Sequence, residues 1–225
     1  MRLGVLGGTF NPIHLGHLHV ARSVRRLFAL SEVRLVVAAA PPHKPPESLI
    51  PLMHRYAMVC LATARDRTLV PSLVELEHPA SSFSIDTMRK LSRQVSRSGG
   101  VLYFIAGLDS LLDVKSWRES EKLLTAYNFV FVARPGVDCA DARDVLPRKA
   151  LSRLLDLTGL DFARARRAIA QESAAEGRVY IVDLGAPDIS ASRVRRRLVA
   201  RRPVERMIPR SVRDYIQKFH LYGER

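Results

Sequence analysis

Two histidines and a glycine-rich turn stand near the start of the chain, in the stretch GGTFNPIHLGH (residues 7–17). The two leading glycines have no Cβ, so backbone N–H groups there can approach a ligand closely. His14 and His17 are three residues apart, and on a helix that begins near Ile13 both imidazoles would face one phosphate-sized space. Amides at a helix start together with two imidazole donors suit a polyphosphate, whose charge they would stabilise during displacement at phosphorus.

Helix capping and metal binding are the alternatives to phosphate binding at this turn. A single histidine at a helix start more often caps the helix or lies at the surface, but a pair beside glycines favours a functional role. The chain has neither a Walker A sequence nor a G-x-G-x-x-G fingerprint. Zinc is disfavoured because the histidines lack an i, i+4 spacing and further ligands nearby, and Cys60 and Cys139 have no metal-ligand spacing.

The elements around the turn predict an α/β protein. A short apolar run precedes the turn and an apolar pattern with helical spacing follows it. Strands are predicted at Arg2–Leu6, Val33–Ala38, Leu69–Leu76, Leu102–Ala106, Phe129–Ala133 and Val179–Asp183. Further helices are predicted at Leu52–Ala64, Ser84–Val95 and Ser192–Arg202. This alternation predicts a Rossmann-like, doubly wound, mostly parallel sheet with helices on both faces, and binding groups at the carboxyl ends of its strands.

Two of these helices and one longer segment carry more specific expectations. The helix at 52–64 is expected to bury one side, formed by Met53, Tyr56, Ala57, Cys60 and Ala64. The helix at 192–202 is expected to turn Val194 and Leu198 inward and most of its arginines toward solvent. Residues 141–177 are rich in Ala, Arg and Leu and contain no motif, so they are expected to form a helical insertion, with an oligomer contact as the alternative.

Length and composition bound the class of protein. The 225 residues, 47% of them hydrophobic, predict a single domain over residues 1–225. No apolar stretch approaches the ~20 residues of a membrane span, and no signal-peptide pattern opens the chain, so a cytoplasmic protein that does not bind membranes is expected. The net charge of +14 favours polyanionic partners, either nucleic acid or small phosphorylated substrates.

Further motifs follow the turn at residues 7–17 along the chain. They are PPHK (41–44), SSFSIDTM (81–88), AGLDSL (106–111) with Trp117 after it, ARPG (133–136), DISASRVR (188–195) and IPRSVRDYIQKFHLY (208–222). The turn resembles the nucleotide-binding signature of the HxGH nucleotidyltransferase superfamily. Together and in this order, the motifs resemble the bacterial nicotinate-nucleotide adenylyltransferases of that superfamily. The match covers nearly the whole chain apart from residues 141–177.

The resemblance implies transfer of the adenylyl group of ATP to nicotinate mononucleotide, giving deamido-NAD and pyrophosphate, with Mg²⁺ held by the phosphates. The mononucleotide's 5′-phosphate is expected to attack in line without a covalent enzyme intermediate, so the protein supplies alignment and electrostatic stabilisation. By similarity, the catalytic residues are His14, His17 and Arg195, and the β- and γ-phosphates are also gripped by Ser190 and Ser192. Hydroxyls at a helix start and an arginine one turn later do make an anion site, although either serine alone is more simply a cap.

The same resemblance assigns residues to the two nucleotides. The other ATP-binding residues are expected to be Gly8, Thr9, Phe10, Gly16, Gly107, Asp109 and Arg134. The residues expected to bind nicotinate mononucleotide are Lys44, Ser84, Trp117 and Arg118. Asp109 can accept hydrogen bonds from ribose hydroxyls or cap a helix, and Trp117 can stack on the pyridine ring or belong to the core. Ser84 and amides near it and near Arg118 are expected to receive the nicotinate carboxylate.

Some positions depart from the family's pattern. Asn11 stands where aspartate is more common, which removes a charge near the phosphates, and Ala38 and Ala39 stand where an asparagine is common. Ser192 replaces a usual threonine. Arg118 replaces a common tyrosine, and its charge is hypothesised to strengthen the preference for a carboxylate over an amide.

The residues also argue against rival functions. Phosphopantetheine adenylyltransferase shares the HxGH turn, but SSFSIDT, Trp117 and the chain length argue against it. A class I aminoacyl-tRNA synthetase fragment would need a KMSKS-like motif, which the chain lacks. A nucleic-acid-binding module would suit the charge, but the interleaved aromatics of an RNA-binding sheet are missing, so no nucleic-acid partner is expected. A nucleotide sensor without catalysis has Asn11 as its only hint.

Overall fold

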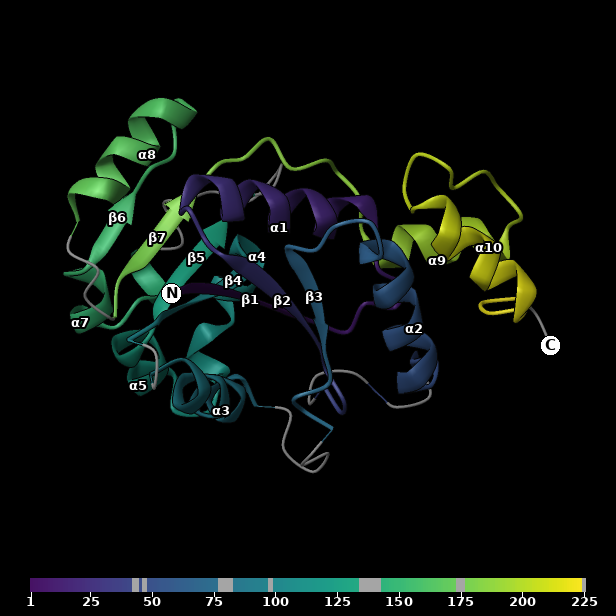
Figure 1. Ribbon diagram of the computed structural model, residues 1–225, viewed down its shortest axis with the longest axis horizontal. Coiled ribbons are helices and arrows are strands. Elements are labelled where there is room, and N and C mark those ends of the chain that lie inside the picture. Colours follow the sequence, from purple (N-terminus) through teal and green to yellow (C-terminus); the bar gives the residue numbers. More distant parts are fainter. Residues whose placement is uncertain are drawn as a thin grey trace.

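One parallel sheet forms the centre of the molecule. The computed structural model describes residues 1–41, 45, 48–76, 83–96, 99–133, 143–172 and 177–223. Within them, seven strands pair in parallel in the order β3-β2-β1-β4-β5-β7-β6 (Figure 1). The strands are β1 (Arg2–Gly8), β2 (Glu32–Val37), β3 (Leu69–Ser72), β4 (Val101–Gly107), β5 (Asn128–Val132), β6 (Leu154–Asp156) and β7 (Val179–Val182).

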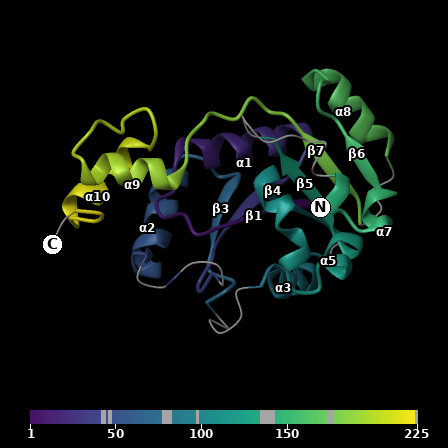
Figure 2. The same cartoon turned by 180° about the vertical axis from the view of Figure 1, so that it is seen from behind.

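Helices cover both faces of this sheet. They are α1 (Leu15–Leu27), α2 (Leu52–Thr63), α3 (Ser84–Ser96), α4 (Leu108–Leu112), α5 (Ser120–Ala126), α7 (Arg148–Leu151), α8 (Phe162–Gln171), α9 (Ala191–Val199) and α10 (Arg210–Lys218), with a 3₁₀ turn at Val114–Ser116. Helix α1 lies on one face and α3 and α5 on the other, while α9 and α10 lie beside α2 at one end (Figures 1 and 2).

Alternating strand residues divide the core into two layers. In β4, Tyr103 and Ile105 pack with α1, whereas Phe104 and Ala106 pack with α3, α4 and α5. Strand β5 repeats this pattern with its valines on the first side and its phenylalanines on the second. Successive side chains of a strand point to opposite faces, so a strand that is apolar throughout requires cover on both. The expected Rossmann-like, doubly wound fold is confirmed.

The chain order of the strands marks one place as the binding crevice. From β1 the chain builds outward through β2 and β3, then returns to the other side of β1 with β4. At such a switch point the loops after the two neighbouring strands diverge and leave a crevice at the carboxyl edge of the sheet. The glycine-rich turn follows β1, and Gly107 ends β4. The strand order therefore brings the two motifs to one edge.

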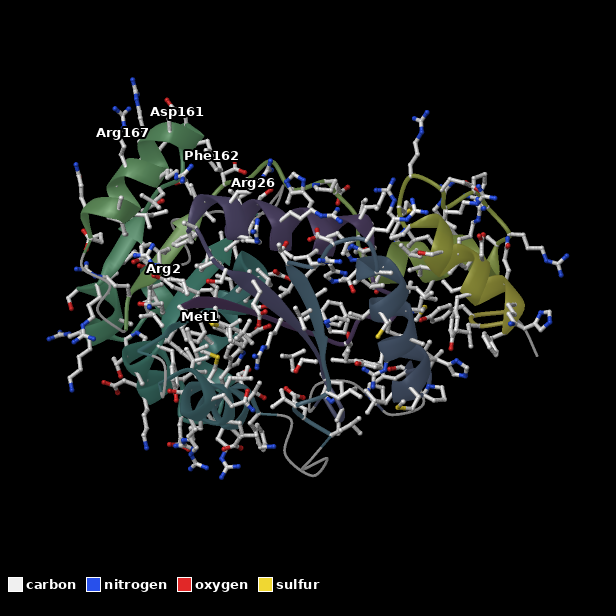
Figure 3. All side chains as sticks on the ribbon, in the orientation of Figure 1. Met1, Arg2, Arg26, Asp161, Phe162 and Arg167 are labelled. Atoms are coloured by element: carbon white, nitrogen blue, oxygen red, sulfur yellow. The ribbon has the colours of Figure 1, made fainter. Side chains whose placement is uncertain are left out.

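Residues 141–177 contain a strand that the sequence pattern did not predict. Helices alone were expected there, but β6 pairs with β7 at the edge of the sheet, between α7 and α8. A strand of three residues is too short for the alternation of apolar and polar residues to be recognised in the sequence. Helix α8 approaches α1 around a cavity of about 250 Å³ that Arg26 and Phe162 help to line, and both are labelled there in Figure 3. That the segment is an insertion stays a prediction.

Helix α2 buries a different side from the expected one. Its buried residues are Arg55, Met58, Val59 and Thr63. Met53 is 59% exposed, so the expected apolar side is wrong. The helix is apolar around most of its circumference, and periodicity therefore could not choose a face. No helix within the described ranges is long and apolar enough to cross a membrane.

Candidate nucleotide-binding site

The two histidines cap the first helix reciprocally. His14 is the N-cap residue of α1, so the helix begins at Leu15 and not near Ile13. The Nδ1 atom of His14 accepts a hydrogen bond from the backbone N–H of His17 at 3.3 Å, and the Nδ1 atom of His17 accepts one from the N–H of His14 at 3.2 Å. This is a capping box built from imidazoles. It pairs the N–H of His14, while the N–H of His17 is shared between His14 Nδ1 and the His14 carbonyl oxygen, which lies 3.0 Å away.

This cap also indicates the tautomer of both rings. A neutral imidazole has one donor and one acceptor nitrogen, so a ring that accepts at Nδ1 has its proton on Nε2. The rings of His14 and His17 stack with centroids 3.6 Å apart and planes at 22°. Both imidazoles therefore have their donor N–H at Nε2, and the two rings lie stacked as a pair.

The residues before the helix form a tightly packed turn. Phe10 has a left-handed backbone (φ 45°), and its ring meets His17 edge-on with centroids 5.0 Å apart. A Cβ at Gly8 would lie 3.1 Å from the Phe10 ring, so glycine allows the ring to fold back over the end of β1. Asn11 is 1% exposed. The turn is thus held by packing as well as by the helix cap.

The start of α9 lies against this turn. The Nη1 atom of Arg195 donates a 2.8 Å hydrogen bond to the backbone oxygen of Asn11, and Nη2 donates to Ser192 Oγ at 3.3 Å. A Cβ at Gly16 would lie 3.0 Å from His14 Nδ1 and 3.6 Å from the Ile189 carbonyl oxygen. The structure therefore brings the two predicted phosphate junctions together, and Gly16 provides the room between them.

Ser190 caps helix α9, as the simpler alternative for this serine predicted. It is the N-cap of α9, and its Oγ accepts a hydrogen bond from the N–H of Arg193 at 3.2 Å. The phosphate contacts predicted for Ser190 and Ser192 stay predictions. Both α1 and α9 begin at this place, and the positive ends of their dipoles add to the attraction of an anion.

The carboxyl end of β4 provides the next part of the site. Gly107 is the N-cap of α4, and Asp109 is the exposed second residue of that helix. The capping alternative for Asp109 is therefore wrong, whereas its predicted ribose contact stays a prediction. Trp117 packs edge-on against Phe104 at a centroid distance of 5.9 Å but is only half-buried. Its indole thus belongs partly to the core.

The residues predicted to receive the nicotinate carboxylate also lie together. Ser84 begins α3, and Arg118 follows Trp117 directly. The Arg118 guanidinium lies 5.0 Å from the centroid of the Phe83 ring and 3.7 Å from a carboxylate oxygen of Asp86. These contacts tie the Arg118 side chain to the start of α3. Lys44 and Arg134, the other predicted binding residues, lie outside the described residues.

Two residues behind the turn were not predicted as site residues from the sequence. Tyr222 donates a 2.7 Å hydrogen bond to Asn11 Oδ1, and Asn11 Nδ2 donates to the Ser48 carbonyl oxygen at 3.1 Å. Burial raises the pKa of the Tyr222 hydroxyl, against the opposing charges of Arg195 and Arg55. Arg55 is 2% exposed and contacts the same turn. For Arg55, the signal available in the sequence was a charged residue within an apolar helix pattern.

Comparisons with known proteins show which family the chain belongs to. Residues 5–197 match the family described as cytidylyltransferase-like. A probable nicotinate-nucleotide adenylyltransferase of Geobacter metallireducens is 40% identical, covering 99% of this chain and 98% of its own. Another, from a strain of Thermus thermophilus, is 36% identical, covering 99% of this chain and 100% of its own.

A solved structure shows the same fold. It is the nicotinic acid mononucleotide adenylyltransferase of Plasmodium falciparum complexed with NaAD, which is 19% identical and superposes with a TM-score of 0.71, covering 98% of this chain and 97% of that one. Identity of 36–40% over nearly the full length of both chains is the stronger observation, because it includes the sequence as well as the architecture. The chain belongs to the nicotinate-nucleotide adenylyltransferases, within the cytidylyltransferase-like family.

Proposed function

We propose that this chain transfers the adenylyl group of ATP to nicotinate mononucleotide by direct displacement. A 5′-phosphate oxygen of the mononucleotide forms a bond to the α-phosphorus, and the bond from that phosphorus to the β-phosphate bridging oxygen breaks. Deamido-NAD and pyrophosphate leave. The observation that supports the proposal is the 2.8 Å bond from Arg195 to the Asn11 carbonyl, because it holds the two helix starts side by side, as a shared triphosphate would require.

The triphosphate is the ligand best matched to these helix starts. The Nε2 atoms of His14 and His17 already have their protons, so both can donate to a phosphate oxygen without a preceding proton transfer. Their cap and stacking hold them in place before the substrate arrives. Donors that are already oriented stabilise the charge of the transition state without reorganisation, which is the main source of catalysis where the enzyme provides no nucleophile.

We assign the mononucleotide to the cluster of Ser84, Trp117 and Arg118. The half-buried indole offers a flat surface for a pyridine ring, and the start of α3 offers amides for a carboxylate. The Asp86 carboxylate near Arg118 lowers the net positive charge there. Selectivity for the acid over the amide would then depend on the Arg118 guanidinium and the nearby backbone amides together.

Mg²⁺ is proposed to enter with ATP, as part of the substrate. Among the described residues, no group of three or more histidine, cysteine, aspartate or glutamate side chains is placed to hold a metal ion. Mg²⁺ commonly binds through substrate phosphates and keeps several of its waters, so a protein cage is not required.

The test is pyrophosphate release from ATP with nicotinate mononucleotide or nicotinamide mononucleotide offered separately. We expect release that depends on the mononucleotide and is faster with the acid, together with deamido-NAD as the product. Reactions without either mononucleotide are the control for ATP hydrolysis. No pyrophosphate release with either mononucleotide, or equal release with and without them, would contradict the proposed reaction.

A further inference from the structure

Arg55 is a buried cation that the proposed chemistry does not use. It lies in the second turn of α2 and is 2% exposed. Its side chain donates four hydrogen bonds, all to backbone carbonyl oxygens: Nη1 to Ala38 at 2.7 Å and to Thr9 at 2.9 Å, Nε to Ile50 at 3.1 Å, and Nη2 to Ala39 at 3.4 Å. Burial lowers the pKa of this guanidinium, while Tyr222 and Glu75 oppose that effect.

Three of these carbonyls belong to the two loops at the predicted site. Thr9 follows β1, and Ala38 and Ala39 follow the neighbouring strand β2. The nearby carboxylate of Glu75 accepts hydrogen bonds from other groups: its Oε2 from the Ala39 N–H at 3.3 Å and its Oε1 from the Thr87 hydroxyl at 2.8 Å. Arginine suits this place because its planar fork has five N–H donors in fixed directions, whereas lysine has three on a flexible stem.

The bond to Thr9 determines which way the next amide points. The Thr9 carbonyl and the Phe10 N–H belong to one planar peptide and point in opposite directions. With the carbonyl held toward Arg55, the N–H points away from α2. Phe10 also has a left-handed backbone at φ 45°, which a residue with a side chain adopts only where its surroundings enforce it. The hydrogen bond from Arg55 supplies part of that enforcement.

We propose that Arg55 is a positioning residue for adenylyl transfer, which orients the Thr9–Phe10 peptide so that the Phe10 N–H serves the transition state. The inference rests on the proposed function, since that function gives the turn its ligand. Burying a charge is costly, and an apolar side chain of similar size could fill the core here at lower cost. An arginine that is buried here and donates its hydrogen bonds to loop carbonyls beside the turn is explained if the reaction depends on the geometry of that turn.

The test compares Arg55→Lys with a control on the same helix, Met58→Ala. Lysine keeps the charge but cannot make all four bonds, whereas Met58 is fully buried in the core and its replacement lowers stability without removing a hydrogen bond to these loops. For Arg55→Lys we expect kcat to fall at least tenfold with the KM for ATP within threefold, because transition-state contacts depend most strongly on orientation. For Met58→Ala we expect a lower melting temperature and kcat within threefold.

Several outcomes would overturn the inference. One is a folded Arg55→Lys protein whose kcat is within threefold of wild type, or whose only change is a higher KM for ATP. Another is a loss of kcat in Met58→Ala equal to that in Arg55→Lys. A third is failure of Arg55→Lys to fold where Met58→Ala folds, which would assign Arg55 to the fold alone. Wild-type protein in the same assay tests the reaction itself. An inactive wild type contradicts the proposed function, whereas an active wild type with an unaffected lysine variant contradicts only the role of Arg55.

Discussion

Replacing His17 by asparagine separates the helix cap from the chemistry. The Oδ1 atom of asparagine takes the place of Nδ1, so it can accept the bond from the His14 N–H that the imidazole accepts at 3.2 Å. Asparagine has no equivalent of the Nε2–H donor. His17→Ala removes both. The pair of variants therefore assigns each effect to one nitrogen of the ring.

The two effects differ in size and in the measurement that detects them. Loss of the cap in His17→Ala should cost about 1 kcal/mol of stability, equivalent to roughly 2–4 °C in melting temperature for a chain of this length. Loss of one oriented donor to a developing phosphate charge should lower kcat by about 10²–10³, or roughly 3–4 kcal/mol. His17→Asn should thus melt close to wild type and still lose turnover about as severely as His17→Ala.

Steady-state pyrophosphate release and thermal melting of the same preparations provide both measurements. His19→Asn is the matched control, because His19 lies on the same helix and bonds the Leu184 carbonyl oxygen at 2.8 Å, away from the turn. Its kcat should stay within threefold of wild type. Turnover of His17→Asn within tenfold of wild type would refute the assignment of His17 Nε2 as a donor to the transition state.

Two further predictions concern tyrosine hydroxyls. Tyr222→Phe removes the hydroxyl that donates to Asn11 Oδ1 at 2.7 Å and leaves a buried acceptor unpaired, so the free energy of unfolding should fall by about 1–3 kcal/mol in urea titrations; an unchanged midpoint would contradict this. Burial raises the pKa of Tyr180 to about 12, so between pH 10 and 12 the unfolded chain loses a proton that the folded chain keeps, and stability should fall as pH rises through that window. The fall should be shallower in Tyr180→Phe, by up to about 3 kcal/mol, and an equal fall in both proteins would exclude this tyrosine as its source.

The sequence predicted the sheet well because its strands are buried on both faces. All six apolar runs that the sequence predicts as strands are strands in the structure, with ends that differ by a few residues. The missed strand, β6, is an edge strand of three half-buried residues, and its pairing with β7 depends on a neighbour that no local pattern shows. Strand order likewise follows from long-range contacts, so the sequence predicted binding groups at the carboxyl ends of the strands but not which strands lie side by side.

Helix α2 shows a different limit of sequence patterns. With apolar residues around most of its circumference, its orientation is decided by the one charged side chain that must find partners inside the protein. Arg55 finds them in carbonyls from loops that are 16 to 46 residues away along the chain. A pattern of residue types identifies such an arginine as anomalous, but only the fold shows which groups it holds.

The histidine turn shows that capping and phosphate binding need not be alternatives. From the sequence, a cap was the simpler explanation for either histidine alone, and a phosphate contact was favoured only for the pair. In the structure each Nδ1 accepts a capping bond, and this same bond places the proton on Nε2. The cap is thus what makes each ring a donor of defined orientation. A histidine can serve both purposes because its two nitrogens differ, whereas serine or aspartate in a capping box would use its side chain for the helix alone.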